Sequence, residues 1–248
     1  MRDIRQTSQY PNYLEKIGWI VERVSGNNFF IKKFPLIGSV IKIQRPEKLN
    51  IEEINNLAKK HRAFQVIIEP KNKKQEIILK TNGFKLSRHP YLPTKTLQID
   101  LTKSKKEIFN HFKKDCRYAI KKTNKLMTKE IKALEDFRNY WKKAVGWKRY
   151  VPPLNHLLSF KKSFGDSSMF LSTKNGNSGA IFLLAEKTGY YWQAFTNKEG
   201  RKALAQYKIL WEGMLWAKKK GAKIFDFEGI YDERFPDKTW KGFTHFKK

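Results

Sequence analysis

The stretch from Arg201 to Ile230 most constrains what this chain can fold into. Apolar residues recur in its first part at helical spacing, and three lysines then precede Gly221, a residue type that commonly ends helices. A short predicted strand, residues 222–228, follows at once and carries Asp226 and Glu228. A long helix that leads into a strand with carboxylates predicts a site at the carboxyl edge of a sheet. The apolar helix face consists of Leu204, Tyr207, Trp211, Met214 and Leu215.

The same order of predicted elements occurs twice along the chain. In each half, three antiparallel strands joined by short turns precede a helix and one further strand. A chain of 248 residues can bury one large core or two modest ones. We therefore predict an α+β fold of two tandem lobes, residues 1–124 and 125–248, each with a mixed, mostly antiparallel sheet flanked by helices.

The charge of the chain is strongly positive. Lysine and arginine number 52 against 23 aspartates and glutamates, a net charge of +29. Such an excess favours an anionic partner, which includes nucleic acid, a phosphorylated substrate and an anionic membrane surface. The alternative is a lysine-rich surface without a specific partner. The densest basic segment is predicted as one helix, residues 104–122, which starts with a capping box formed by Ser104 and Glu107.

The cysteine count and the hydropathy of the chain indicate the compartment in which it works. Cys116 is the single cysteine, which fits a reducing compartment. No apolar run approaches the ~20 residues that span a bilayer, and the first residues lack the apolar segment of a signal peptide. We expect a cytoplasmic monomer that contacts membranes by charge alone. The histidines show no ligand spacing, so we expect neither a metal nor a cofactor.

Three strands, a central helix and a following strand resemble the fold of GCN5-related N-acyltransferases. In those enzymes a glycine-containing turn before the central helix binds the pyrophosphate of acetyl-CoA through backbone N–H groups. The corresponding turn here, residues 200–205, keeps Arg201 and Ala205 but has Leu204 where a glycine is expected. This departure weakens the prediction of a CoA site.

Two tandem copies of this fold without a CoA turn resemble the FemABX family. The matching stretches are spread over essentially the whole chain: residues 8–19, 97–125, 207–230 and 244–247. The resemblance implies transfer of an amino acid from aminoacyl-tRNA to the peptide stem of a UDP-linked or lipid-linked muropeptide. This chain departs from the family in stopping at Lys248, whereas members usually continue with a glycine-containing segment, and it has no room for the helical arm that some members insert.

The resemblance also implies catalytic residues. Lys247 matches the lysine of the family's Phe-Lys pair and is expected to stabilise the oxyanion of ester aminolysis, while Phe246 shapes the site. The alternatives are a solvated terminal lysine and simple packing. Apart from the resemblance, Asp226 and Glu228 share one face of the predicted strand and could accept a proton from the attacking ammonium; the alternative is that Asp226 caps or hydrogen-bonds structure at the strand end.

Further residues are expected to bind the two substrates. Lys32 or Lys33 in the first lobe and Arg149 in the second match residues that grip the precursor's diphosphate, and alternation along the strand lets only one of the two lysines point into a cleft. Trp211 and Tyr207 belong either to a substrate groove or to the core. The basic helix is expected to bind tRNA phosphates through Lys113, Lys114, Arg117, Lys121 and Lys122.

Two other functions remain open from the sequence. One is an N-acyltransferase that uses an acyl thioester on a small amine or protein, which CoA binding would reveal. The other is a non-catalytic basic module that binds RNA or an anionic membrane, which would bind in a salt-dependent manner without any transfer activity.

Overall fold

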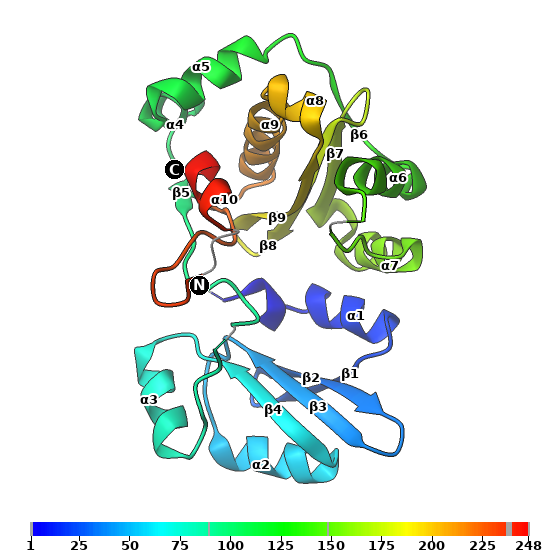
Figure 1. The fold of residues 1–248 in the computed structure, drawn as a ribbon. Coiled ribbons are helices and arrows are strands. Elements are labelled where there is room, and N and C mark those ends of the chain that lie inside the picture. Colours follow the sequence, from blue (N-terminus) through cyan, green and yellow to red (C-terminus); the bar gives the residue numbers. More distant parts are fainter. Residues whose placement is uncertain (1, 89, 148, 237–239, 248) are drawn as a thin grey trace. The chain divides into compact units, whose positions relative to one another are not determined.

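The structure, a computed structural model, describes residues 2–88, 90–147, 149–236 and 240–247, except the side chains of Phe243 and His245. The chain divides into two compact units, Met1–Leu92 and Pro93–Lys248 (Figure 1). Each unit has its own sheet, with four strands in the first and six in the second. The predicted α+β class with two tandem lobes is therefore confirmed.

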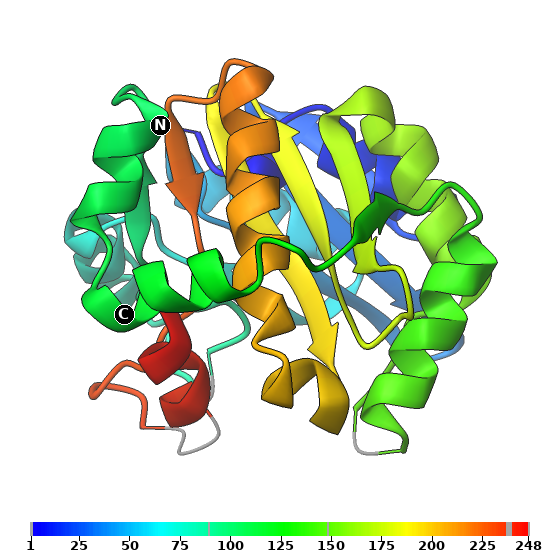
Figure 2. The same cartoon turned by 90° about the horizontal axis from the view of Figure 1, so that it is seen from above.

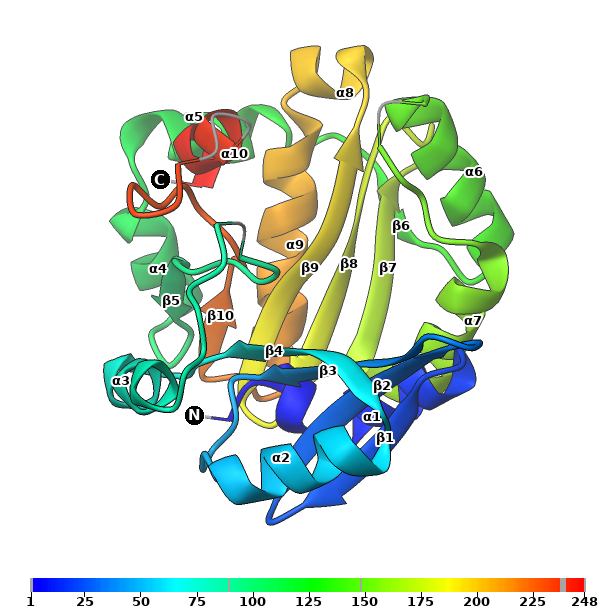
Figure 3. The same ribbon diagram turned by 60° about the horizontal axis from the view of Figure 1, so that its bottom comes forward.

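The first unit is a four-stranded sheet with helices on both faces (Figure 3). Phe29 and Ile31 pack with Ile54 and Leu57 of α2, whereas Phe30 lies 5.7 Å from the ring of Tyr10 in α1. This alternation follows from the period of two in a strand. In chain order the unit contains α1 (Gln9–Lys16), β1 (Ile20–Val24), β2 (Asn27–Phe34), β3 (Gly38–Gln44), α2 (Ile51–Lys60), β4 (Ala63–Glu69) and α3 (Lys73–Thr81), after the short 3-10 helix Ile4–Gln6.

The second unit is a six-stranded sheet in the order β5-β10-β9-β8-β7-β6. Its parallel pair is β9 with β10, and every other neighbouring pair is antiparallel. The elements are β5 (Gln98–Asp100), α4 (Lys105–His111), α5 (Lys114–Lys122), β6 (Thr128–Glu130), α6 (Leu134–Val145), α7 (Leu154–Phe164), β7 (Ser168–Thr173), β8 (Ser178–Ala185), β9 (Thr188–Thr196), α8 (Lys198–Lys202), α9 (Ala205–Lys219), β10 (Ile224–Asp226) and α10 (Trp240–Lys247), with the 3-10 helix Gly165–Ser167 between α7 and β7.

Helices α9 and α6 cover opposite faces of the second sheet (Figures 1 and 2). Phe182 packs in the core beneath α9, where Gly213 has no Cβ; an added Cβ would lie 2.1 Å from the ring. On the other face, Phe137 of α6 packs against Phe170 at 5.2 Å and Phe195 at 5.3 Å. Gly221 ends α9 with φ +89°, as the sequence predicts.

The predicted duplication appears as the same succession of elements in both units. In each, three antiparallel strands precede a helix and a strand that pairs parallel with the third: β1, β2, β3, α2, β4 and then β7, β8, β9, α9, β10. The units divide at residue 92 instead of 124 because β5 pairs with β10 and Phe112, before α5, packs against Trp211 of α9. No helix among the described residues is long and apolar enough to cross a membrane.

The basic segment forms two helices, which corrects the predicted continuous helix over residues 104–122. Ser104 and Glu107 do form the capping box. Phe112 and Lys113 then adopt extended backbone angles, with ψ of 151° and 154°, and separate α4 from α5. Arg117 binds the carbonyl oxygens of Asn110 and Phe112, both at 2.9 Å, and so satisfies acceptors that the end of α4 leaves without helical partners.

Candidate active site

Helix α10 is fixed on the segment that follows β10. Gly229 allows the close approach, since a Cβ there would lie 2.1 Å from the ring of Trp240. Thr244 accepts a hydrogen bond from the backbone N–H of Tyr231 at 2.6 Å. The ring of Phe246 lies 4.8 Å from that of Tyr207 in α9, edge to face. These contacts set the position of the last residues of the helix.

Lys247 is held by backbone carbonyl groups. Its Nζ donates to the carbonyl oxygens of Phe227 at 2.7 Å and Gly229 at 2.5 Å, and lies 5.7 Å from the ring centroid of Tyr191. Burial lowers the pKa of Lys247 to about 8, although the charges of Glu228 and Asp226 act in the opposite direction. An ammonium group has three donors, so two are used by these carbonyls and one remains to contact another group.

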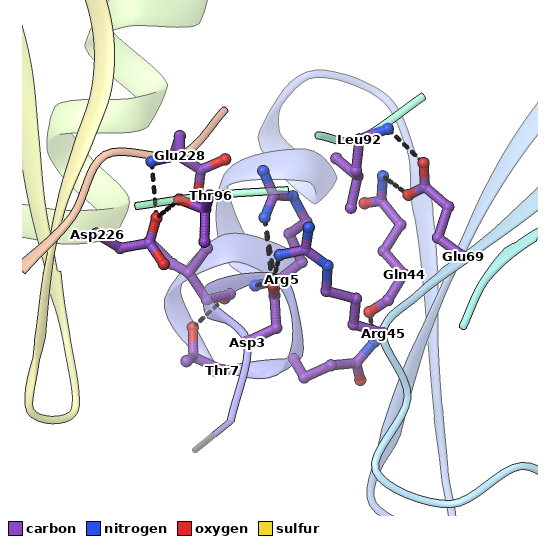
Figure 4. Close-up of polar contacts among 12 residues, drawn as sticks. Asp3, Arg5, Thr7, Gln44, Arg45, Glu69, Leu92, Thr96, Asp226 and Glu228 are labelled. Carbon is purple, nitrogen blue, oxygen red and sulfur yellow. Dashed lines mark hydrogen bonds and ion pairs between the residues drawn. The ribbon is translucent and has the colours of Figure 1, made fainter. Parts of the chain in front are cut away.

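Asp226 organises the segment that supplies these carbonyls (Figure 4). Its buried carboxylate accepts hydrogen bonds from the Thr96 hydroxyl at 2.6 Å and the Gln98 amide at 2.7 Å. It also accepts the backbone N–H of Glu228 at 2.7 Å, a residue in the left-handed region with φ 64°. Both carboxylate oxygens therefore bind protein donors. This arrangement fits the alternative for Asp226, a structural role at the strand end, better than the role of proton acceptor.

A cavity of about 380 Å³ lies in the second unit between the sheet edge, α4, α5, α9 and α10. Most of its lining side chains are apolar, and Lys247 contributes one of the few charged groups. It brings together five of the predicted site residues: Lys113, Tyr207, Trp211, Phe246 and Lys247. Trp211 packs edge to face with Phe112 at 5.7 Å, so it belongs to the core as well as to the cavity wall. The sequence left these two roles of Trp211 as alternatives.

Lys103, His111 and Cys116 are among the cavity residues that the sequence analysis missed. All lie on or beside α4 and α5, and nothing in their spacing indicates that this segment folds over the sheet edge. Burial raises the pKa of the Cys116 thiol above its ordinary value, so the thiolate is disfavoured.

The other predicted residues of the second unit do not line this cavity. Arg149 donates to the carbonyl oxygen of Ala194 at 3.3 Å. Lys121 lies 5.9 Å from the ring of Phe109, and Lys122 lies 5.7 Å from that of Tyr118. Lys114 and Lys122 are exposed on α5. The basic helices thus place a cavity-lining lysine, Lys113, beside an exposed cationic surface.

The predicted first-unit lysines differ in environment. The Nζ of Lys32 donates to the carbonyl oxygen of Gly18 at 2.9 Å and lies 5.8 Å from the ring of Trp19, whereas Lys33 is exposed. Lys42 lies 5.4 Å from the same ring and was missed, because its contact depends on strand pairing in space. Lys32 and Lys42 therefore form a cationic pair on Trp19, which is a local basic site of this unit.

Buried polar residues also anchor the start of the first unit (Figure 4). Asp3 contacts Arg5 at 3.2 Å and Arg45 at 2.8 Å. Although burial opposes ionisation, these two arginines hold the pKa of Asp3 below its usual range. Glu69 accepts the backbone N–H of Leu92, yet burial raises its pKa. The ion pairs of Asp3 therefore join the start of the chain to Arg45, which follows β3.

The turn before α9 bears on the acyl-CoA alternative. Leu204 has φ 54° and ψ 25°, the left-handed conformation in which glycine costs least. The N–H of Gly200 is bound by the side chain of Asn197 at 2.8 Å, and Arg201 binds the carbonyl oxygen of Thr196 at 3.1 Å. Because these donors already have protein partners, the turn gives the acyl-CoA alternative no further support.

Comparison with known proteins connects this arrangement to solved structures. FemX matches with a TM-score of 0.78 over 99% of this chain and 88% of its own, at 16% sequence identity. The fold is FemX-like. A domain assigned to a lysylphosphatidylglycerol synthetase of Agrobacterium fabrum matches with a TM-score of 0.59 over 97% of this chain and 78% of its own, at 13% identity. L-PGS from Bacillus licheniformis matches with 0.55 over 88% and 71%, also at 13% identity.

Sequence comparisons give no corresponding match. No protein-family model matches the chain, and no curated protein does. At 13–16% identity the structural likeness establishes the fold alone. The FemABX-like fold expected from the sequence is thus confirmed, and the function has to be argued from the site.

Proposed function

We propose that the protein is an aminoacyltransferase that moves an amino acid from aminoacyl-tRNA to an amine on the peptide stem of a peptidoglycan precursor. The resemblance to the FemABX family and the FemX-like fold support this proposal. The observation that carries it is the placement of Lys247, a cation held on the wall of a largely apolar cavity with one donor not used by the two carbonyls.

The reaction is the aminolysis of an ester. The acceptor amine attacks the carbonyl carbon that joins the amino acid to the tRNA, the new C–N bond forms, and the C–O bond breaks. The tRNA hydroxyl leaves with a proton that the amine gives up. Because the donor ester is already activated, the protein needs mainly to position the two substrates and to stabilise negative charge on the carbonyl oxygen.

Lys247 has the chemistry that the charged intermediate requires. Its ammonium is oriented by the Phe227 and Gly229 carbonyls, so little reorganisation is needed when the oxyanion forms. The largely apolar lining favours this interaction because an attraction between charges is stronger where the dielectric constant is low. Asp226 acts as a positioning residue, since it binds the N–H of Glu228 and thereby shapes the segment that carries both carbonyls.

The tRNA is proposed to contact the basic helices. Lys113, Lys114, Arg117, Lys121 and Lys122 lie on or beside α5, and Lys113 also lines the cavity. A phosphate backbone bound along this surface would leave the 3′ end close to the cavity. A contact of Lys32 or Lys33 with the diphosphate of the precursor, and a separate contact of Arg149, stay predictions that the family resemblance implies.

The test uses the full chain with a pool of charged tRNAs and a UDP-linked or lipid-linked muropeptide. Mass spectrometry of the muropeptide is expected to show the gain of one amino-acid residue, and the loss of this gain in Lys247→Met. A parallel reaction contains acetyl-CoA and a simple amine. Acetylation without muropeptide modification would favour the N-acyltransferase alternative. Salt-sensitive tRNA binding without either product would favour the non-catalytic module.

A further inference from the structure

The hairpin that joins β2 to β3 ends in exposed apolar side chains. Phe34 is 41% exposed, Leu36 104% and Ile37 69%, and Phe64 of β4 packs beside Phe34 with a ring distance of 5.9 Å. We call these four residues the apolar tip. Scattered exposed apolar residues are normal, but a contiguous group of them marks an interaction surface.

The fold of the first unit gains little from this composition. Leu36 lies in the left-handed region with φ 66°, where a bulky side chain is disfavoured and glycine or asparagine would fit more easily. The turn is tight, since the N–H of Ile37 donates to the carbonyl oxygen of Pro35 at 2.8 Å. Leu36 is fully exposed, so it makes no packing contact that offsets the strain. We therefore expect its side chain to contact a partner outside the unit.

Cationic residues accompany the apolar tip. Lys33 is exposed directly before Phe34, and the carbonyl oxygen of Arg62 binds the N–H of Ser39 at 3.1 Å, which places exposed Arg62 at the base of the hairpin. Exposed Lys59 is joined to Arg62 through a backbone hydrogen bond at 3.1 Å. Glu22 lies on the neighbouring β1, where Lys60 and His61 bind it at 2.7 and 3.0 Å.

We propose that the apolar tip inserts into the headgroup region of an anionic lipid bilayer. Aliphatic and aromatic side chains at a loop end gain from partial burial at the acyl boundary, and flanking lysine and arginine are attracted to anionic lipid. Lys33, Lys59 and Arg62 are the residues that contact the headgroups. This inference does not depend on the proposed transfer reaction.

Other occupants fit these residues less well. Nucleic acid is bound by phosphate contacts and aromatic stacking, and neither uses Leu36 or Ile37. A second copy of the chain would bring the same positive charge to the contact, which repels. A projecting turn of this length is also small beside the roughly 800 Å² per partner of a stable protein interface.

The experiment measures co-sedimentation with vesicles of phosphatidylcholine alone and of phosphatidylcholine mixed with phosphatidylglycerol. The first variant is Leu36→Asn with Ile37→Thr, because asparagine tolerates the left-handed conformation and the fold should persist. The matched control is Leu158→Gln, an exposed leucine of α7 in the second unit. A third variant, Lys33→Gln with Arg62→Gln, removes charge at the tip. Circular dichroism verifies the fold of each.

The wild-type chain is expected to bind the phosphatidylglycerol vesicles and not those of phosphatidylcholine alone. The tip variant should lower the partition coefficient by on the order of ten-fold, since two buried apolar side chains are lost. The charge variant should lower it by about five-fold per cation. Leu158→Gln should match wild type.

Three results would overturn the proposal. Equal binding to both vesicle types would exclude recognition of anionic lipid. Unchanged binding of a folded tip variant would place any membrane contact on the general basic surface instead. A change in the sedimentation coefficient of the lipid-free protein, caused by the tip variant, would show that the tip joins copies of the chain.

Discussion

The ammonium of Lys247 lies 2.5 Å from the carbonyl oxygen of Gly229, a contact made across 18 residues of sequence. This contact requires α10 to pack against the segment after β10. Gly229 allows the packing because it has no Cβ, which would lie 2.1 Å from the ring of Trp240. Gly229 and Lys247 therefore depend on each other. Gly229 has no side chain, so α10 can pack against this segment, and α10 carries Lys247.

Replacement of Lys247 by methionine should remove most of the transfer activity. Loss of one oxyanion donor costs about 10²–10³-fold in kcat. Methionine keeps the length and apolar character of the lysine stem, so the variant should keep the fold. The control is Lys241→Met on the exposed side of the same helix, which should leave kcat unchanged. Equal losses in both variants would contradict a specific role for Lys247.

The pH dependence of activity should show a basic limb with an apparent pKa of about 8. Burial lowers the pKa of Lys247 to that value, so the ammonium loses its proton as pH rises through 8 and the oxyanion loses its cation. Lys247→Met should lack this limb in its residual kcat profile. If the basic limb persists in the variant, it reflects the titration of another group.

Stability should respond to pH in the opposite direction. The lysine of the unfolded chain keeps its proton up to its ordinary pKa of 10.5, whereas the folded chain releases it near 8. Between these values the unfolded state binds more protons, so the contribution of Lys247 makes the free energy of unfolding rise with pH. Urea titrations of wild type and Lys247→Met across this interval measure the difference, which should increase with pH.

Chemical modification of Cys116 should report occupation of the cavity. It is the single cysteine of the chain, it lines the cavity, and burial raises its pKa, so N-ethylmaleimide should react slowly near neutral pH. Aminoacyl-tRNA should slow the reaction further, and deacylated tRNA should protect less. If charged tRNA leaves the modification rate unchanged while transfer proceeds, the donor occupies another site.

The double variant Lys114→Gln with Lys122→Gln should weaken tRNA binding in a salt-dependent way. If both lysines contact phosphates, the slope of log K against log salt should fall in magnitude by about two. Lys142→Gln with Lys143→Gln, an equally exposed pair on α6, is the control and should not change the slope. Arg117 is unsuitable for this test because it also binds two backbone carbonyls between α4 and α5.

Much of the architecture follows from local patterns in the sequence. The repeated order of strands and helix, the capping box at Ser104 and the helix end at Gly221 all occur where the patterns predict them. The break at Phe112 and Lys113 does not, because the apolar stripe continues through it and Arg117 stabilises it from beyond the break. Strand β6 and helix α8 were also missed, since each is short.

The site was only partly predictable for a similar reason. Lys247 and Phe246 were predicted through a family resemblance and Tyr207 lies on the predicted apolar helix face, but their convergence depends on α10 docking against α9. The position of β5 in the second sheet depends on pairing with β10, more than a hundred residues later, and local propensity carries no information about such a partner. Cys116 and Lys103 reach the cavity only through that long-range arrangement.

The pairing of β10 between β5 and β9 also sets the order in which the second unit is completed. Strand β5 has no strand neighbour other than β10 among the described residues. Its backbone groups can therefore enter the sheet only after β10 has been synthesised. Contacts this distant along the chain form slowly, and the apolar residues before α4 stay uncovered in the meantime. A chain released from the ribosome before residue 224 would therefore have an incomplete sheet edge. Chaperones and proteases would bind such a chain.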